Sequence, residues 1–110
     1  MKKNTNDRIK NILVSNHKNY SLTIKGNSMY PTFVNGQVLP VIPISRVSKI
    51  SEEDIIVYKR KKDGLIIHRV KKAFVILGSK YYITKGDNNK KNDKYFVRKK
   101  DIIGIVKHNT

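Results

Sequence analysis

Four side chains in this sequence have the right chemistry for hydrolysis by an activated serine: Ser28, His68, Asp87 and Asp93. Such hydrolysis needs a hydroxyl nucleophile, a base within hydrogen-bonding reach, and a carboxylate that orients the base. Ser28 lies in "GNSMYPT", His68 in the alternating stretch "LIIHRVKK", and both aspartates in "TKGDNNKKND". The three segments are far apart in the chain, so only a tertiary fold can bring them together.

Each segment also has a simpler explanation. A serine between Gly26 and Pro31 is commonly a turn residue, because glycine tolerates unusual backbone angles and proline restricts the chain that follows. A single histidine in a strand is commonly structural, and an aspartate in "GDNN" commonly bonds its own backbone in a turn. Taken singly, none of the segments indicates an active site.

Length and composition limit the possible chemistry. The chain has 110 residues, the size of one ordinary domain, and it contains no cysteine. Disulfides, thiolate metal sites and cysteine nucleophiles are therefore excluded. We expect neither a metal nor another cofactor. The expected location is cytoplasmic, with peripheral membrane contact left open.

The charge of the chain favours anionic partners. Twenty-four basic and 8 acidic residues give a formal net charge of +16, which attracts acidic peptides, anionic membranes or nucleic acid. The basic residues form short runs rather than one stripe, and no helix-turn-helix, zinc-finger or RNA-binding pattern is present. A solubilising surface and attraction of an acidic partner both stay open, with nucleic acid the less favoured partner.

The chain is predicted to be mainly β. Residues 5–15 suit a short amphipathic helix, with Ile9, Ile12 and Leu13 on one stripe. Downstream, short apolar or alternating segments are separated by Gly and Asn turns. The predicted strands are "YSLTIKG", "VLPVIPI", "DIIVYKR", "LIIHRVKK", "FVIL", "KYYIT" and "IIGIV". This pattern indicates an antiparallel β-barrel or sandwich with a short N-terminal helix.

Two features refine this organisation. Two prolines interrupt "VLPVIPI", which predicts an edge or irregular strand. The apolar part of the N-terminus is only "ILV", short of the roughly 7–15 residues of a signal peptide, and no run approaches the roughly 20 residues of a membrane span. We divide the chain into an N-terminal segment, 1–21, and a domain, 22–110.

Six blocks in order resemble the type I signal peptidases of the endoplasmic-reticulum and archaeal kind, which are related to LexA-type peptidase domains. The resemblance covers about residues 22–107, and it implies a serine peptidase domain, here without a transmembrane anchor. The blocks are "GNSMYPT" at 26–32, "NGQV" at 35–38, "EDIIVYK" at 53–59, "HRV" at 68–70, "TKGDNN" at 84–89 followed by Asp93, and "IIGIV" at 102–106.

This resemblance implies a role for each candidate residue. Ser28 would be the nucleophile and His68 the general base that takes its proton. Asp93 is the preferred residue to orient the imidazole, while Asp87 would shape the site, although the two aspartates could exchange roles. Arg69, on the opposite face of its strand from His68, is expected to be structural.

The segment around Ser28 would complete the site. Backbone N–H groups near Ser28 would form an oxyanion hole, and Met29 and Pro31 would pack and position the turn. Gly26 and Asn27 are included among these substrate and oxyanion residues. Gly26 offers no side-chain hydroxyl to the oxyanion hole, unlike the bacterial branch of the family.

The implied substrate is a leader or precursor peptide, acidic by charge complementarity, with a small residue before the cut. One alternative is a LexA-type regulatory peptidase with a lysine base, because Lys71 and Lys72 follow His68 closely. Its self-cleaving form is disfavoured, since residues 1–25 contain no alanine or glycine for a typical cleavage site. A second alternative is a non-catalytic binding domain that uses its basic surface on nucleic acid or an anionic membrane.

Overall fold

A computed structural model describes residues 19–107 of the chain. The helix predicted for 5–15 and most of the 1–21 segment lie outside the described residues. Within residues 19–107, no helix has the length and apolar character needed to cross a membrane.

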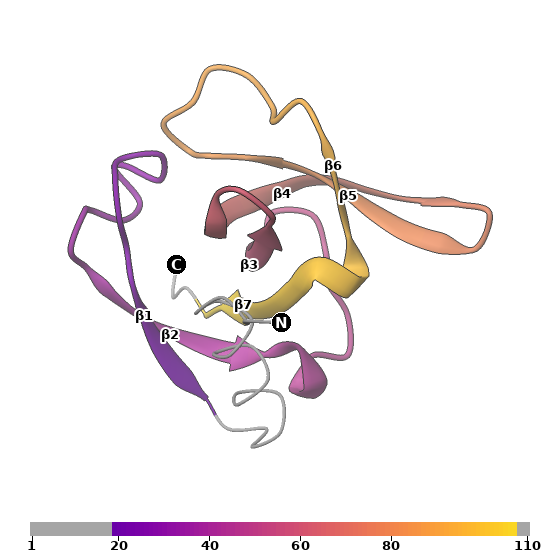
Figure 1. Cartoon of the computed structure of the whole chain (residues 1–110), viewed down its shortest axis with the longest axis horizontal. Coiled ribbons are helices and arrows are strands. Elements are labelled where there is room, and N and C mark those ends of the chain that lie inside the picture. Colours follow the sequence, from indigo (N-terminus) through magenta and orange to yellow (C-terminus); the bar gives the residue numbers. More distant parts are fainter. Residues whose placement is uncertain (1–18, 108–110) are drawn as a thin grey trace.

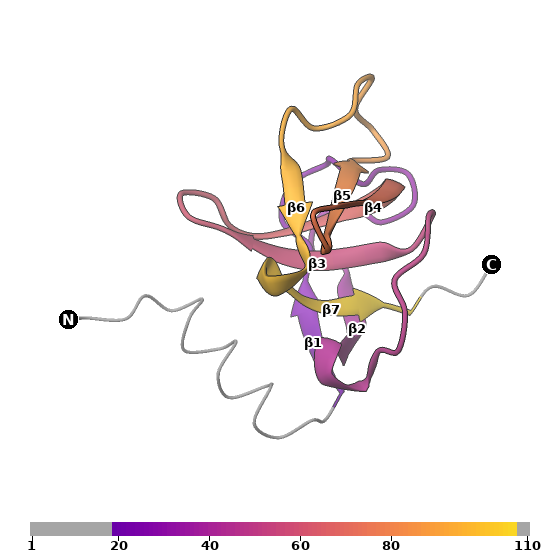
Figure 2. The same ribbon diagram turned by 90° about the vertical axis from the view of Figure 1, so that its right-hand side faces the viewer.

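Seven strands form one antiparallel sheet in the order β1-β2-β7-β3-β4-β5-β6 (Figures 1 and 2). The mainly antiparallel β class predicted from the sequence is confirmed. Two 3-10 turns, Ile44–Arg46 and Lys99–Asp101, lie at the sheet margin. The strands are β1 Tyr20–Thr23, β2 Val38–Pro43, β3 Ile55–Arg60, β4 Gly64–Ile76, β5 Ser79–Lys85, β6 Phe96–Arg98 and β7 Ile102–Val106.

The sheet curls so that its central strand is covered on both faces. Ile55 and Val57 of β3 point into one apolar cluster, whereas Ile56 and Tyr58 point into another. Alternate residues of a strand face opposite sides of a sheet, so β3 belongs to both clusters and is an almost continuous apolar run. Side-chain packing on both faces therefore fixes β3, the strand with which β4 pairs.

Strand β2 is not an edge strand, contrary to the prediction made from its prolines. It pairs with β1 through residues 38–41 and with β7 through residues 41–43. Pro43 has no partner in β1, because β1 begins opposite Val41. Pro40 has no partner in β7, because β7 ends opposite Val41. A proline removes no ladder bond where the neighbouring strand is missing, which explains how an internal strand accommodates two.

Two further strands differ from the expectation. The segment "LIIHRVKK" and the first three residues of "FVIL" belong to one 13-residue strand, β4, with a register shift between Val70 and Lys72 in its pairing with β5. The three-residue strand β6 was not predicted, because it is too short to show a period. The predicted segment "IIGIV" is confirmed as β7.

Substituting Gly104 of β7 by alanine is expected to lower the free energy of unfolding by about 3 kcal/mol or more. A Cβ there would lie 2.6 Å from the Ile42 carbonyl oxygen and 2.6 Å from Val41 Cγ1, and the backbone cannot move aside cheaply. The measurement is urea unfolding of the purified variant.

Gly36→Ala is the matched control for Gly104→Ala. It adds the same methyl group, but nothing lies within 4 Å of the added Cβ and only the positive φ of +90° penalises it, by about 1 kcal/mol. Equal losses at both glycines would contradict the packing argument.

Candidate active site

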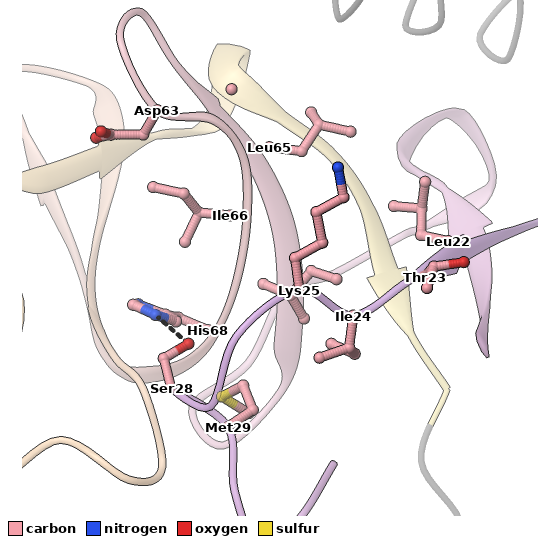
Figure 3. A pocket seen from close by; sticks show the side chains of 12 residues that line it. Leu22, Thr23, Ile24, Lys25, Ser28, Met29, Asp63, Leu65, Ile66 and His68 are labelled. Carbon is pink, nitrogen blue, oxygen red and sulfur yellow. Dashed lines mark hydrogen bonds between the residues drawn. The ribbon is translucent and has the colours of Figure 1, made fainter. Parts of the chain in front are cut away.

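Ser28, His68 and Asp93 are in hydrogen-bonding contact. Ser28 Oγ lies 3.2 Å from His68 Nε2 (Figure 3), and His68 Nδ1 lies 2.7 Å from Asp93 Oδ2. A carboxylate only accepts hydrogen bonds, so Nδ1 carries the hydrogen and Nε2 of the neutral ring is left to accept one from the serine hydroxyl. His68 is buried with 8% of its surface exposed, which limits the orientations its ring can adopt.

The three residues come from three different parts of the fold. His68 is carried by β4, where it pairs with Ile56 of β3, and the pairing of β4 with β5 begins at the next residue, Arg69. Ser28 lies in the loop between β1 and β2, and Asp93 lies in the loop between β5 and β6. The two loops meet directly, because Asn88 N–H donates to the carbonyl oxygen of Ser28 at 2.8 Å.

The loop that carries Ser28 is held at both its start and its middle. Gly26 has a φ of +86°, and its N–H donates to Asn35 Oδ1 at 2.8 Å. Asn27 accepts a bond from the Tyr30 N–H at 3.1 Å through its carbonyl oxygen, closing a tight turn around Ser28. Pro31 follows a cis peptide bond, and its side chain is exposed rather than packed in the core.

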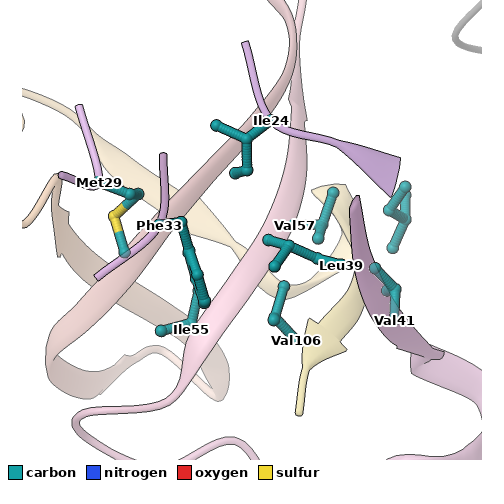
Figure 4. Packing of buried hydrophobic residues seen from close by; sticks show 9 residues of the cluster. Ile24, Met29, Phe33, Leu39, Val41, Ile55, Val57 and Val106 are labelled. Atoms are coloured by element: carbon teal, nitrogen blue, oxygen red, sulfur yellow. The ribbon is translucent and has the colours of Figure 1, made fainter. Parts of the chain in front are cut away.

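Met29 fastens this loop to the core. Its side chain is only 2% exposed and lies in the apolar cluster with Ile24, Phe33 and Ile55 (Figure 4). Its sulfur also accepts a weak hydrogen bond from the Asp87 N–H at 3.4 Å. The residue after Ser28 therefore points inward, and Ser28 itself stays at the surface of the groove.

Asp87 does not contact His68. It receives two hydrogen bonds from Arg69, Nε at 2.9 Å and Nη2 at 2.8 Å, and one from the Thr32 hydroxyl at 2.5 Å. The Arg69 guanidinium holds the pKa of the Asp87 carboxyl below its usual range, and the Thr32 bond acts in the same direction. This ion pair joins the face of β4 opposite His68 to the loop after β5, and the Thr32 bond joins that loop to the segment that follows Ser28.

The carboxylate of Asp93 has further donors besides His68. Thr84 Oγ1 donates to Asp93 Oδ2 at 2.7 Å, and the Tyr58 hydroxyl lies 3.3 Å from the same oxygen. Tyr58 is bonded in turn to the Tyr95 hydroxyl at 2.8 Å. Burial raises the pKa of Tyr58 well above its usual value, so this phenol stays protonated and can donate to the carboxylate.

Gly86 is the position with least room in the site. A Cβ there would lie 2.7 Å from the Ser28 carbonyl oxygen, 2.7 Å from Asn89 Nδ2 and 3.0 Å from His68 Nε2. Only a glycine lets the loop after β5 approach Ser28 and His68 so closely.

Sequence reasoning did not single out Gly86, Tyr58, Thr84 or Thr32 as site residues. Gly86 and Thr84 fall inside the block "TKGDNN", which was the only signal for them. Thr32 and Tyr58 likewise fall inside the blocks "GNSMYPT" and "EDIIVYK", but their roles depend on contacts with distant parts of the chain.

The two lysines after His68 lie elsewhere. Lys71 Nζ is paired with the Glu53 carboxylate at 2.9 Å, and the side chain of Lys72 is exposed. Within the described part of the chain, the Ser28 hydroxyl is hydrogen-bonded to His68 and to neither lysine. The geometry therefore favours the imidazole over either ammonium as the base.

Ser28 and His68 lie at one end of a groove of about 630 Å³. One wall comes from β1 and the residues after it, including Leu22 and Ile24, and the other comes from Leu65 to Ile67 of β4 (Figure 3). Lys25 and Asp63 are the charged residues of the lining. The strand β1 is an edge of the sheet, and its residues Leu22 and Thr23 line the groove.

Comparisons with known proteins give consistent matches. A profile of the family described as "Peptidase S24-like" matches residues 3–107. The chain is 32% identical over 106 aligned positions to the signal peptidase complex catalytic subunit SEC11 of Lachancea thermotolerans, covering 86% of this chain and 62% of that protein.

Two further SEC11 subunits are similar. The Chaetomium globosum protein is 31% identical, with 77% of this chain and 54% of that protein covered. The Yarrowia lipolytica protein is 28% identical, with 86% and 59% covered. The chain thus spans somewhat more than half the length of these curated relatives.

Acidification is expected to weaken the fold through Asp87. Because its pKa is lowered in the folded protein relative to the reference value of 3.8, the charged carboxylate stabilises the fold above that pH, and this contribution is lost as pH falls through the folded-state pKa. Urea unfolding of wild type and Asp87→Asn across acidic pH measures it. The difference in the free energy of unfolding should shrink as pH falls, and a constant difference would contradict the ion-pair argument.

Proposed function

Because the chain belongs to the Peptidase S24-like family, we propose that it is a serine endopeptidase that cleaves a leader or precursor peptide, with Ser28 as nucleophile and His68 as general base. The observation that carries this proposal is the 3.2 Å contact between Ser28 Oγ and His68 Nε2. A nucleophile and base within hydrogen-bonding reach, with the base held by a third group, is the arrangement that activates a serine.

In the proposed reaction, His68 Nε2 takes the hydroxyl proton as Ser28 Oγ attacks the scissile carbonyl carbon. Asp93 keeps Nδ1 protonated and stabilises the imidazolium that forms. The same imidazolium then protonates the leaving amine, which yields an acyl-enzyme. A water molecule, deprotonated by His68, attacks the acyl carbon, releases the second product and restores Ser28.

The oxyanion of the tetrahedral intermediate would be stabilised by backbone N–H groups of the Ser28 loop. Such a donor contributes about 3–4 kcal/mol to transition-state stabilisation. Gly26 and Asn27 set the backbone path before Ser28, while the buried Met29 fixes the path after it. A loop whose backbone is already fixed can stabilise the developing oxyanion without having to reorganise during the reaction.

The substrate would bind as an extended segment along the free edge of β1. Edge strands offer unpaired backbone groups that an extended peptide can pair with, and the groove beside β1 leads to Ser28. By resemblance to signal peptidases, the residue before the cut is small. The net charge of +16 favours peptides with acidic residues, and the SEC11 relatives make a precursor peptide the natural substrate class.

Cleavage of a diverse peptide library, followed by mass spectrometry, tests the proposal and reveals the residues around the cut. Ser28→Ala or His68→Ala should lower the cleavage rate by about 10⁴-fold or more, and Asp93→Asn by about 10³–10⁴-fold. Lys71→Ala and Lys72→Ala are the controls and should retain cleavage. Cleavage that persists in Ser28→Ala, or that is lost in Lys71→Ala but kept in His68→Ala, would overturn the assignment.

Gly86→Ala should reduce the cleavage rate about 10²-fold or more, because the added methyl group displaces His68 or the Ser28 loop. The thermal unfolding midpoint is measured in parallel to separate loss of fold from loss of activity. Lys85→Ala, one residue earlier and half-buried, is the neighbouring control. Full activity in a folded Gly86→Ala protein would show that this close approach is unimportant for catalysis.

A further inference from the structure

The hairpin formed by β4 and β5 extends beyond the rest of the sheet. Strand β6 pairs with β5 only along Tyr81–Ile83, so the hairpin from Val75 to Lys80 has no further strand beside it. In Figure 1 this part of the hairpin projects to the right, away from the other strands and from the Ser28 loop on the opposite side. It is a protruding element that does not border the groove.

The tip of the hairpin is apolar and exposed on both faces. Val75 is 61% exposed, Ile76 is 45% exposed and Leu77 is 100% exposed. Consecutive residues of a strand face opposite sides, so Val75 and Ile76 place apolar groups on both faces at once. A hairpin that projects into water would be expected to carry polar residues at such positions.

Leu77 also occupies an unfavourable backbone conformation. The two-residue turn joins Ile76 to Ser79, and its residues Leu77 and Gly78 have φ values of +49° and +81°. Such a turn prefers Asn or Asp before Gly, because a branched apolar residue is strained at positive φ. A fully exposed leucine adds no buried apolar surface to the fold, and local strain of this kind accompanies functional positions.

Aromatic packing stiffens the root of the hairpin. Phe74 of β4 stacks on Tyr81 of β5 with ring centroids 5.8 Å apart, and Phe96 of β6 packs edge-on against Phe74 at 5.0 Å. The tip is therefore held by a rigid root, and this rigidity lowers the entropic cost of inserting the tip into a partner.

Basic residues surround the root of the hairpin. A hollow of about 410 Å³ lies between the hairpin and the 3-10 turn before β7, and its lining contains four cationic side chains and no acidic one. These side chains are Lys80, Arg98, Lys99 and Lys100, with Ser79 and Tyr81 completing the lining. On the opposite strand, Lys71 and Lys72 are exposed.

We propose that the β4–β5 hairpin docks the protein on an anionic lipid bilayer. The tip, Val75 to Leu77, enters the boundary between headgroups and acyl chains, while the basic hollow contacts lipid phosphates. An apolar tip beside cationic groups matches an anionic membrane surface. A nucleic acid would use the cations but would gain nothing from an exposed leucine, so the bilayer accounts for both features.

Vesicle flotation of the full chain tests the docking. Wild type should bind vesicles of phosphatidylcholine mixed with phosphatidylglycerol and bind pure phosphatidylcholine far more weakly. Leu77→Asn, which suits the turn and should unfold at no lower temperature than wild type, should weaken binding about 10-fold. Lys80→Gln combined with Lys99→Gln should weaken it about 10-fold as well.

Two control variants match these changes. Val38→Asn removes an apolar side chain with the same 61% exposure as Val75, but on β2. Lys61→Gln with Lys62→Gln removes two charges at the turn before β4, the opposite end of that strand from the tip. Both controls should bind like wild type. Equal weakening in controls and hairpin variants would mean that charge or apolar surface in general, and not the hairpin, causes binding.

A tryptophan reports insertion directly, since the chain contains none. Fluorescence of Leu77→Trp should shift to shorter wavelength on adding anionic vesicles, whereas that of Val38→Trp should not. Failure of wild type to float with anionic vesicles, binding to duplex DNA but not to vesicles, or no shift at position 77 would each overturn the proposal. None of these measurements uses peptide cleavage, so they stand or fall separately from the proposed activity.

Discussion

The structure depends on one imidazole that must reach two loops at once. His68 uses one ring nitrogen toward Ser28 and the other toward Asp93, so any shift of its backbone would break one contact or the other. Strand β4 meets this constraint by lying inside the sheet, paired with β3 and β5. Its next residue, Arg69, uses the opposite face to hold Asp87, which ties the loop after β5 to the same strand.

The carboxylate of Asp93, on the side of His68 away from Ser28, is itself surrounded by hydrogen-bond donors. Asp93 Oδ2 is close to donors on His68, Thr84 and Tyr58, and Tyr58 reaches Tyr95 in turn. A buried carboxylate without such partners would carry a large desolvation penalty. Tyr58 also fills the apolar cluster on one face of β3, so the same side chain packs the core and supports the charge.

Local patterns in the sequence predicted much of this arrangement but not all of it. The short apolar segments "DIIVYKR" and "IIGIV", bounded by Gly and Asn turns, predicted strands that the structure contains. The order of blocks pointed to Ser28, His68 and the two aspartates. Pairing of β2 on both sides depends on where its neighbours begin and end, and β6 is too short to show a period. Contacts of Tyr58, Thr32 and Gly86 join distant segments, and no local pattern encodes them.

The separation of Ser28 from its supporting residues along the chain has a consequence during protein synthesis. The Thr32 hydroxyl is bonded to Asp87, and the Ser28 carbonyl oxygen accepts from the Asn88 N–H. The loop around Ser28 therefore lacks these two hydrogen bonds until the segment after β5 has left the ribosome. A nascent chain that ends before Asp93 has a serine and a histidine but nothing to orient the imidazole. The Ser28 hydroxyl of an incomplete chain is thus an ordinary alcohol, and the activation that we propose for it requires the finished fold.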